Sequence, residues 1–239
     1  MDDLVKKRIA IIPARGGSKR LTKKNIIDFM GKPMISWSIN AALDSKIFDS
    51  VLVSTDCKET AEIAQKYGAD VPFLRKEYND DYSTVSQATK STLNQLQKYN
   101  GKNYKTVVQL MANCPLRSSK NIIDQVKQFE ESKENFSLLS GFNYGMFNPW
   151  WAHYKNKKGS FEKLFKNYDD SVRSQDFPNL ICPSGATWIS DVKKLNESNT
   201  FYSDGYSFFK LSWLSAVDID DKTDLELAKA AFIIKNEKL

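Results

Sequence analysis

The stretch IAIIPARGGSKRLTKKN, from Ile9 to Asn25, joins a short apolar run to a loop that is rich in glycine and positive charge. The apolar run predicts a buried strand that ends near Pro13. Two adjacent glycines and five cationic side chains follow it within the same stretch. Because like charges repel, such a loop is costly unless an anionic group lies among them.

A strand, a glycine-containing loop and a helix form the arrangement with which α/β folds bind phosphate, because backbone N–H groups converge there. Arg15 can donate to two phosphate oxygens at once, while Lys19 and Lys24 carry compact charges on long side chains. Gly16 and Gly17 allow a close approach of the backbone. The glycine spacing matches neither G-x-x-x-x-G-K-[ST] nor G-x-G-x-x-G, so spacing alone leaves a nucleotide site open.

Strand and helix patterns alternate along the first half of the chain. Strands are expected at 8–13, 50–55 and 106–111, and helices after Pro33, from Lys58 to a stop at Gly68, over 84–99, and over 119–133 with Ser118 or Ser119 as the cap. This alternation, with continuous apolar strands, predicts a Rossmann-like α/β fold. Its sheet should be mainly parallel and doubly wound, with helices on both faces.

The pattern changes in the second half. Further strands are expected at 136–142, 184–190 and 215–220, followed by a closing helix in which Thr223 and Glu226 form a capping box. Residues 143–180 are aromatic-rich and irregular, and we interpret them as an insertion from a single domain that spans 1–239. Exposed aromatic side chains there would mark either an interface or a small satellite core.

Composition limits the possible classes of protein. The 239 residues are 41% hydrophobic and 27% charged, which is ordinary for a globular domain. We expect no membrane partner, because no apolar run approaches the length of a membrane span, and no secretory signal peptide. The three cysteines predict a cytoplasmic protein without disulfides, and the lone His153 disfavours a Ser-His-Asp hydrolase.

Beyond these patterns, IPARGGSKRLTKKN resembles the signature of the cytidylyltransferases that activate nine-carbon acidic sugars, namely CMP-sialic acid synthetases and their relatives for legionaminic and pseudaminic acid. Supporting segments follow in the same order over nearly the entire chain: GKPMISWSI, VSTD, VPFLR, CPLR, RSQDFP, SGATWI and DIDDKTDLELA. The resemblance implies that CTP and a 2-keto-3-deoxy sugar acid give a CMP-sugar and pyrophosphate, with Mg²⁺. It also implies a homodimer built through the inserted segment.

The resemblance carries over to individual residues of the nucleotide site. It implies that the triphosphate and nucleoside are lined by Arg15, Gly16, Gly17, Ser18, Lys19, Lys24 and Asn25. Arg75, in VPFLR, resembles a residue near the nucleotide base, although it could equally form a surface ion pair. Arg15 and Lys19 are also expected to act in catalysis.

Asp218 and Asp220 are the candidate metal ligands. They flank Ile219, so in a strand both carboxylates would point to one face, where they repel unless a divalent cation lies between them. Mg²⁺ takes one or two protein carboxylates and completes its shell with water and phosphate oxygens. The resemblance implies this use, and that one carboxylate orients or deprotonates the attacking hydroxyl. Asp221 and Asp224 should favour the N-terminus of the closing helix.

The acceptor region departs from the family pattern. Met111 stands where sialic acid synthetases have a glutamine that faces the sugar, which suggests a less hydroxylated or differently acylated acceptor. Arg173 and Gln175 resemble the family's acceptor-binding pair, and an arginine there could hold the sugar carboxylate. Trp188 stands where a tyrosine is common. These changes leave the acceptor open.

Three other functions compete with this interpretation. A nucleotidyltransferase for Kdo or for a sugar phosphate would share the sheet and the reaction. A dinucleotide-binding oxidoreductase would use an acidic residue after the second strand, where Asp56 lies, but its first loop would carry different glycine spacing and less charge. The net charge of +6 would suit a nucleic-acid-binding module, yet we expect no nucleic-acid partner because no basic helix or aromatic RNA-binding signature is present.

Overall fold

The computed structural model describes residues 7–132, 137–166 and 172–236. Its strands are β1 (Arg8–Pro13), β2 (Asp28–Phe29), β3 (Lys32–Pro33), β4 (Ser50–Ser54), β5 (Thr106–Gln109), β6 (Leu138–Asn143), β7 (His153–Lys155), β8 (Phe161–Lys163), β9 (Ile181–Asp191) and β10 (Ser207–Lys210). Its helices are α1 (Met34–Ser45), α2 (Lys58–Lys66), α3 (Val85–Asn100), α4 (Ser119–Glu131), α5 (Val192–Ser198), α6 (Trp213–Ala216) and α7 (Lys222–Asn236). Short 3-10 turns lie at η1 (Lys24–Ile26), η2 (Pro149–Trp151) and η3 (Ser174–Asp176).

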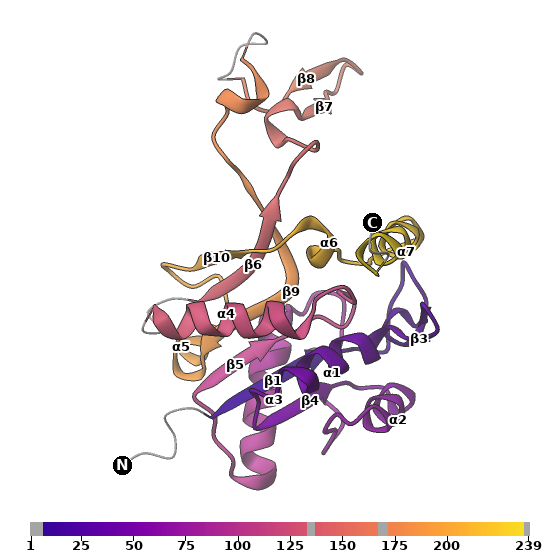
Figure 1. Cartoon of the computed structure of the whole chain (residues 1–239), viewed down its shortest axis with the longest axis vertical. Coiled ribbons are helices and arrows are strands. Elements are labelled where there is room, and N and C mark those ends of the chain that lie inside the picture. Colours follow the sequence, from indigo (N-terminus) through magenta and orange to yellow (C-terminus); the bar gives the residue numbers. More distant parts are fainter. Residues whose placement is uncertain (1–6, 133–136, 167–171, 237–239) are drawn as a thin grey trace.

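A six-stranded sheet with the order β10-β6-β9-β5-β1-β4 forms the centre of the molecule (Figure 1). Strand β1 pairs in parallel with β4 and β5, and β10 pairs in parallel with β6. Strand β9 runs antiparallel to both of its neighbours, β5 and β6. The predicted α/β fold with a mostly parallel sheet is therefore confirmed, with β9 as the reversed strand.

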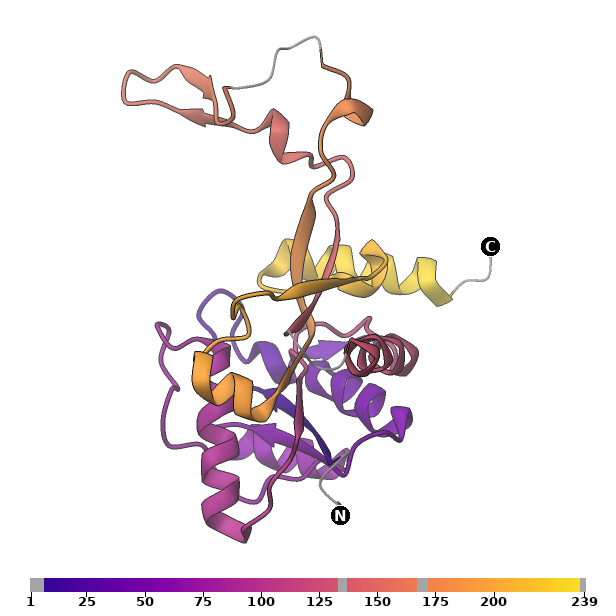
Figure 2. The same ribbon diagram turned by 90° about the vertical axis from the view of Figure 1, so that its left-hand side faces the viewer.

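Helices cover both faces of this sheet, as Figure 2 shows from the side. Ala10 and Ile12 of β1 pack in a buried cluster with side chains of α1, α2 and α4. Ile9 and Ile11 point the other way and pack with side chains of α3 and α5. Because successive strand residues face opposite sides, a strand buried on both faces is apolar throughout, as the sequence predicted.

The helix boundaries follow local capping chemistry. Thr84 caps α3 in a reciprocal box with Gln87, and Ser118 caps α4 in the same way with Asn121. Helix α2 ends just before Gly68, whose φ of 90° suits glycine. The expected helices are confirmed with boundaries shifted by one or two residues, and Ser118, not Ser119, is the cap of α4.

Two expectations near the C-terminus are wrong. Residues 215–220 do not form a strand: Ser212 caps the short helix α6, and the extended chain after it is held to the loop after β5, where the Ile219 N–H donates to the Asn113 carbonyl at 3.0 Å. The strand beside β6 is β10 instead. Helix α7 starts with a different box from the expected one, since the backbone N–H of Asp224 donates to Asp221 Oδ1 at 3.0 Å and that of Asp221 donates to Asp224 Oδ2 at 3.1 Å.

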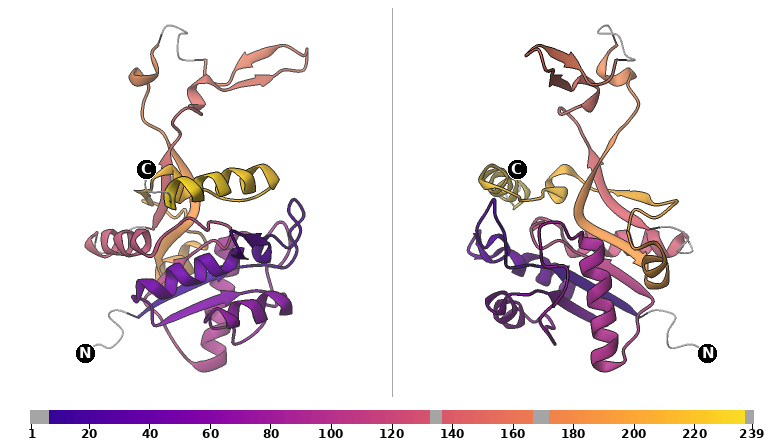
Figure 3. Two further views of the ribbon diagram at one scale, coloured as in Figure 1. Left: turned by 45° about the vertical axis from the view of Figure 1, so that its right-hand side comes forward. Right: turned by 180° about the vertical axis from the view of Figure 1, so that it is seen from behind.

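Strands β6 and β9 lead into an arm, which in the described part of the chain comprises residues 144–166 and 172–180 and stands away from the body (Figure 3). The arm contains η2, the β7–β8 hairpin and η3. Trp150 packs on Phe165 and Phe177 within it, at ring-centroid distances of 4.9 and 6.0 Å. Met146, Phe147 and other large apolar side chains are exposed, so the arm combines a small core of its own with apolar surface.

All three cysteines are free. Among the described residues, no helix combines the length and the apolar character that crossing a bilayer would require.

Candidate active site

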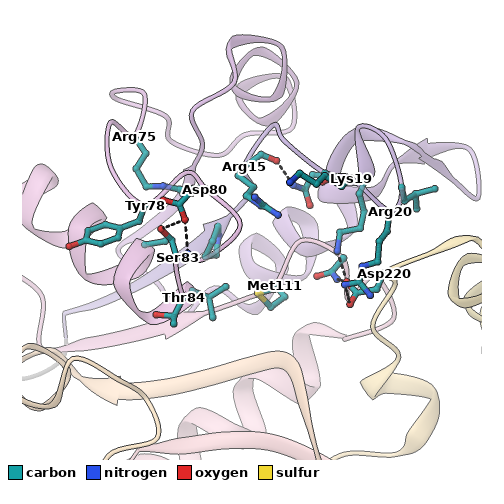
Figure 4. A pocket seen from close by; sticks show the side chains of 18 residues that line it. Arg15, Lys19, Arg20, Arg75, Tyr78, Asp80, Ser83, Thr84, Met111 and Asp220 are labelled. Atoms are coloured by element: carbon teal, nitrogen blue, oxygen red, sulfur yellow. Dashed lines mark hydrogen bonds and ion pairs between the residues drawn. The ribbon is translucent and has the colours of Figure 1, made fainter.

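A cleft opens where β1 ends and where the chain leaves β5 (Figure 4). Parallel α/β sheets usually bind ligands at this edge. The cleft draws side chains from the loop after β1, the segment before α3, the loop after β5 and the segment before α7. Its lining consists of Pro13, Arg15, Ser18, Lys19, Arg20, Leu21, Lys24, Asn25, Arg75, Tyr78, Asp80, Ser83, Thr84, Val85, Ala88, Met111, Asn113 and Asp220.

The cationic loop after β1 lines this cleft, and carboxylates partner its charges. Arg15 Nη1 lies 2.6 Å from Asp81 Oδ1, and Lys19 pairs with the other oxygen of the same carboxylate. These cations hold the pKa of Asp81 below its usual value. Asn25 is buried and donates from Nδ2 to the Arg15 carbonyl at 2.9 Å, which fixes the course of the loop.

The two glycines of the loop have different roles. A Cβ on Gly16 would lie 2.8 Å from Cys57 Cβ, and the Gly16 N–H donates to Asp56 Oδ1 at 2.8 Å. Gly16 is therefore required by packing, and Asp56 orders the loop. A Cβ on Gly17 would meet no atom within 4 Å, so the space beside it is open.

Arg75 lines the cleft although it is only 4% exposed. Its Nη1 donates to the Ser54 carbonyl at the end of β4 at 2.7 Å, and its Nε donates to Asn79 Oδ1 at 2.9 Å. Burial lowers the pKa of its guanidinium. The alternative of a surface ion pair is wrong for Arg75, which ties β4 to the segment before α3.

Asp218 and Asp220 meet at the amide of Asn113, whose Nδ2 bonds to Asp218 Oδ1 and lies 3.4 Å from Asp220 Oδ1. Asp218 is the more enclosed carboxyl: burial, with the neighbouring Asp220 charge, raises its pKa to about 6. Asp220 lies 2.7 Å from Lys24 Nζ and 2.5 Å from Arg20 Nη2. Burial alone would raise the pKa of Asp220, but the hydrogen bonds and charges of these two cations lower it.

This pair fits a divalent cation. Both groups are hard oxygen donors of the kind that Mg²⁺ takes one or two at a time. The raised pKa of Asp218 shows that its negative charge is poorly compensated by the protein alone. The two carboxylates come together because Ile219 between them is held to Asn113, and not because they lie in a strand. Magnesium at this pair stays a prediction.

The expected acceptor residues are spread over three places. Met111 lines the cleft and packs closely on β9, where a Cβ on Gly185 would lie 2.7 Å from its Cγ. Trp188 does not line the cleft: its Nε1 donates to the Ser184 carbonyl at 2.8 Å and its ring packs on Tyr202. Arg173 and Gln175 lie in the arm, where Arg173 Nε pairs with Asp176 Oδ2 at 2.8 Å. The structure therefore brings Met111, but neither Trp188 nor the arm residues, to the cleft.

Several lining or neighbouring residues were missed by sequence reasoning. Arg20 lies in the cationic stretch but was not singled out, and Asn113 lies in the segment that follows β5. Asp80 and Asp81 lie just before the cap of α3, and no local pattern indicates that Asp81 pairs with the loop after β1.

Comparison with known proteins decides the family. The family model described as Cytidylyltransferase matches residues 9–224. The chain belongs to the cytidylyltransferase family. Its members are enzymes, and this chain is one of them, with the fold expected of a nucleotidyltransferase.

The relatives extend over the whole chain. Pseudaminic acid cytidylyltransferase of Campylobacter jejuni subsp. jejuni serotype O:23/36 is 37% identical over 234 residues, which cover 97% of this chain and 98% of the relative. CMP-N,N'-diacetyllegionaminic acid synthase of Legionella pneumophila is 30% identical over 236 residues, with coverage of 97% and 98%. A solved structure of CMP:2-keto-3-deoxy-manno-octonic acid synthetase complexed with CTP has a TM-score of 0.71 at 16% identity, covering 96% of this chain and 99% of that one. At that identity, the last comparison shows the fold alone.

Proposed function

We propose that this cytidylyltransferase transfers CMP from CTP to the anomeric hydroxyl of a nine-carbon 2-keto-3-deoxy sugar acid and releases pyrophosphate. The observation that carries the proposal is the cleft itself, which is lined by Arg15 and Lys19 from the loop after β1 and by Asp220 from the segment before α7, with Asp218 beside Asp220 at the Asn113 amide. The names of the full-length relatives, which include pseudaminic and legionaminic acid enzymes, support the same reaction class.

The loop after β1 would hold the triphosphate. Arg15, Lys19 and Lys24 carry charges that match phosphate oxygens, and Ser18 adds a hydroxyl donor at the same wall. The open space beside Gly17 permits a phosphate to approach the backbone. Arg75 would act indirectly. Its hydrogen bonds fix the end of β4 and the segment before α3, next to the expected position of the base.

In the reaction, a bond forms between the anomeric oxygen and the α-phosphorus while the bond from that phosphorus to the pyrophosphate oxygen breaks. The cations of the loop stabilise the negative charge that builds up on the phosphoryl oxygens. Asp218 and Asp220 would hold Mg²⁺, which supplies further positive charge beside the triphosphate. One of the two carboxylates orients the sugar hydroxyl and accepts its proton.

The acceptor is proposed to be a pseudaminic or legionaminic type of acid. Met111 offers a thioether to the cleft where sialic acid synthetases have an amide, so the site lacks one hydrogen-bond partner for a hydroxylated sugar. The alternative of Kdo or a sugar phosphate has the likeness of fold in its favour, but no residue of the cleft that singles it out.

We also propose a homodimer and a cytoplasmic location. The arm exposes Met146, Phe147 and Phe161, and such a patch on a projecting element suits an interface with a second copy. Arg173 and Gln175 would then be presented on the arm to the partner. Three free cysteines suit a reducing compartment.

An acceptor screen tests the proposal. The purified protein is incubated with Mg²⁺, each nucleoside triphosphate in turn and one of four acids: Neu5Ac, a legionaminic acid, a pseudaminic acid or Kdo. Pyrophosphate release is expected with CTP and a nine-carbon acid together, and not with CTP alone. Release that needs no acceptor, or that occurs only with Kdo, would contradict the proposal.

A further inference from the structure

Two of the cations expected to bind triphosphate are already engaged by one carboxylate of the chain itself. Asp81 uses one oxygen for Arg15 and the other for Lys19. We propose that Asp81 is an internal competitor for phosphate, which occupies Arg15 and Lys19 until a nucleotide displaces it. This inference rests on the proposed function, because it concerns the same nucleotide cleft.

Asp81 belongs to a strap, residues 76–83, that is fastened at both ends. Arg75 anchors one end through the Ser54 carbonyl and Asn79, and Thr84 anchors the other as the cap of α3. Between these points the strap passes along the cleft, whose lining includes Tyr78, Asp80 and Ser83. The anchors hold Asp81 close to the loop while its side chain remains one-third exposed and free to leave.

The neighbouring Asp80 shows that the strap does not need Asp81 for its own shape. Asp80 Oδ1 accepts from the Tyr82 N–H at 2.8 Å, from the Ser83 N–H at 2.7 Å and from the Ser83 hydroxyl at 2.9 Å. These bonds form the turn that leads into α3. The Asp81 carboxylate instead pairs with Arg15 and Lys19, two cations of the loop after β1, and takes no part in this turn.

The charges decide the direction of the competition. A triphosphate brings several negative charges and many acceptor oxygens to the same two cations, whereas Asp81 brings one charge and two oxygens. The nucleotide therefore displaces the Asp81 carboxylate, and both ion pairs must break for it to bind. Once the cations are taken, the released carboxylate lies near bound phosphate and is repelled, so the strap moves away from the loop. Asp81 thus weakens binding of free phosphate compounds, and opening of the strap accompanies loading of the site.

The test compares two variants that each remove one negative charge from adjacent positions. Asp81→Asn removes the carboxylate that pairs with the cations, and Asp80→Asn, the matched control, retains an acceptor for the turn. Binding of CTP and of inorganic tripolyphosphate is measured by calorimetry on the whole chain without divalent metal, with melting temperatures to confirm folding. Because one partly exposed pair, with Arg15, and one pair with the largely exposed Lys19 are released, the Kd of Asp81→Asn should fall about three- to ten-fold for both ligands. Asp80→Asn should lower the Kd by clearly less, because it removes a negative charge near the cleft but breaks no ion pair with Arg15 or Lys19.

An equal or higher Kd for Asp81→Asn, or an equal decrease in both variants, would overturn the inference. The two ligands separate this failure from failure of the proposed function. If the unaltered protein does not bind CTP even after Mg²⁺ is added, the proposed function fails, and the tripolyphosphate affinities still decide the role of Asp81.

Discussion

At the scale of single residues, the cations that the loop after β1 brings to the cleft pair with carboxylates on other segments of the chain. Lys24 and Arg20 come from the loop after β1, and Asp220 comes from the segment before α7, about 200 residues away along the chain. Such pairs hold the loop in position before a ligand arrives. A ligand that carries more negative charge than a carboxylate can replace the carboxylate in these pairs.

Replacement of Arg15 or Lys19 by alanine tests the phosphate loop. Each change should lower kcat roughly 100- to 1,000-fold, because a charge-assisted contact to the reacting phosphate is lost, while the melting temperature stays nearly unchanged. Lys23→Ala is the matched control, since Lys23 lies in the same stretch but pairs with Glu59 outside the cleft at 2.7 Å. Near-normal turnover of either test variant would refute the triphosphate assignment.

Asp218→Asn and Asp220→Asn separate a metal pair from a structural pair. Both variants should lose activity at every Mg²⁺ concentration, because charge needed beside the triphosphate is gone. In metal-free protein at neutral pH, Asp218→Asn should melt at the same or a higher temperature, since the change removes a buried charge beside Asp220. A lowered melting temperature with normal turnover per folded molecule would speak against the metal role.

The pH dependence of the same variant follows from the pKa of Asp218. In the folded protein this pKa is raised to about 6, above the ordinary value, so the folded state binds the proton more tightly than the unfolded state. The contribution to stability is therefore present at low pH and lost as pH rises through about 6. Thermal melts of metal-free protein should show that any advantage of Asp218→Asn over the unaltered chain shrinks as pH is lowered below this value.

Met111 bears on the choice of acceptor. Neu5Ac should be a poorer substrate than a deoxy, di-N-acylated nine-carbon acid, because a buried hydroxyl without a partner costs about 1–3 kcal/mol. Met111→Gln restores an amide and should raise kcat/KM for Neu5Ac relative to the deoxy acid. Steady-state rates with both acids measure this, and equal kcat/KM values in the unaltered enzyme would count against the idea.

At the scale of elements, the loop after β1 depends on close contact with the loop after β4. Gly16→Ala should lower the melting temperature of the ligand-free protein, because the new Cβ would lie 2.8 Å from Cys57 Cβ. Gly17→Ala should leave it unchanged, because nothing lies within 4 Å of that position. The affinity of Gly17→Ala for CTP then tests whether phosphate approaches the backbone at this position. A weaker affinity indicates that it does, and an unchanged affinity indicates that it does not.

At the scale of the whole molecule, the arm offers apolar surface that the body of the chain does not cover. Light scattering should show a dimer at micromolar concentration, with an interface built from residues between Phe142 and Phe165. Replacing the exposed Phe147 and Phe161 by serine should shift the protein toward monomers, while the satellite core around Trp150 keeps the arm folded. A stable monomer of the unaltered protein would exclude the proposal.

The sequence by itself determined the elements whose signals are local. Short continuous apolar runs predicted β1, β4 and β5, and a serine cap at Ser118 or Ser119 placed α4, because such a cap satisfies backbone groups within a few residues. The cationic loop was found for the same reason. Its glycines and charges are adjacent in the chain. The repulsion between these charges predicts an anionic ligand without any knowledge of the tertiary contacts.

Only the tertiary structure decided what depends on distant partners. The segment 215–220 has the composition of a strand but is held to Asn113, beyond the reach of any local pattern. The burial of Arg75 and the position of Trp188 outside the cleft lining also depend on which strands become neighbours. The pairing of Asp81 with Arg15 joins residues 66 positions apart, whose proximity is set by the order of β1 and β4 in the sheet. Local chemistry fixes the elements, whereas the contacts between elements fix the charges that face one another in the cleft.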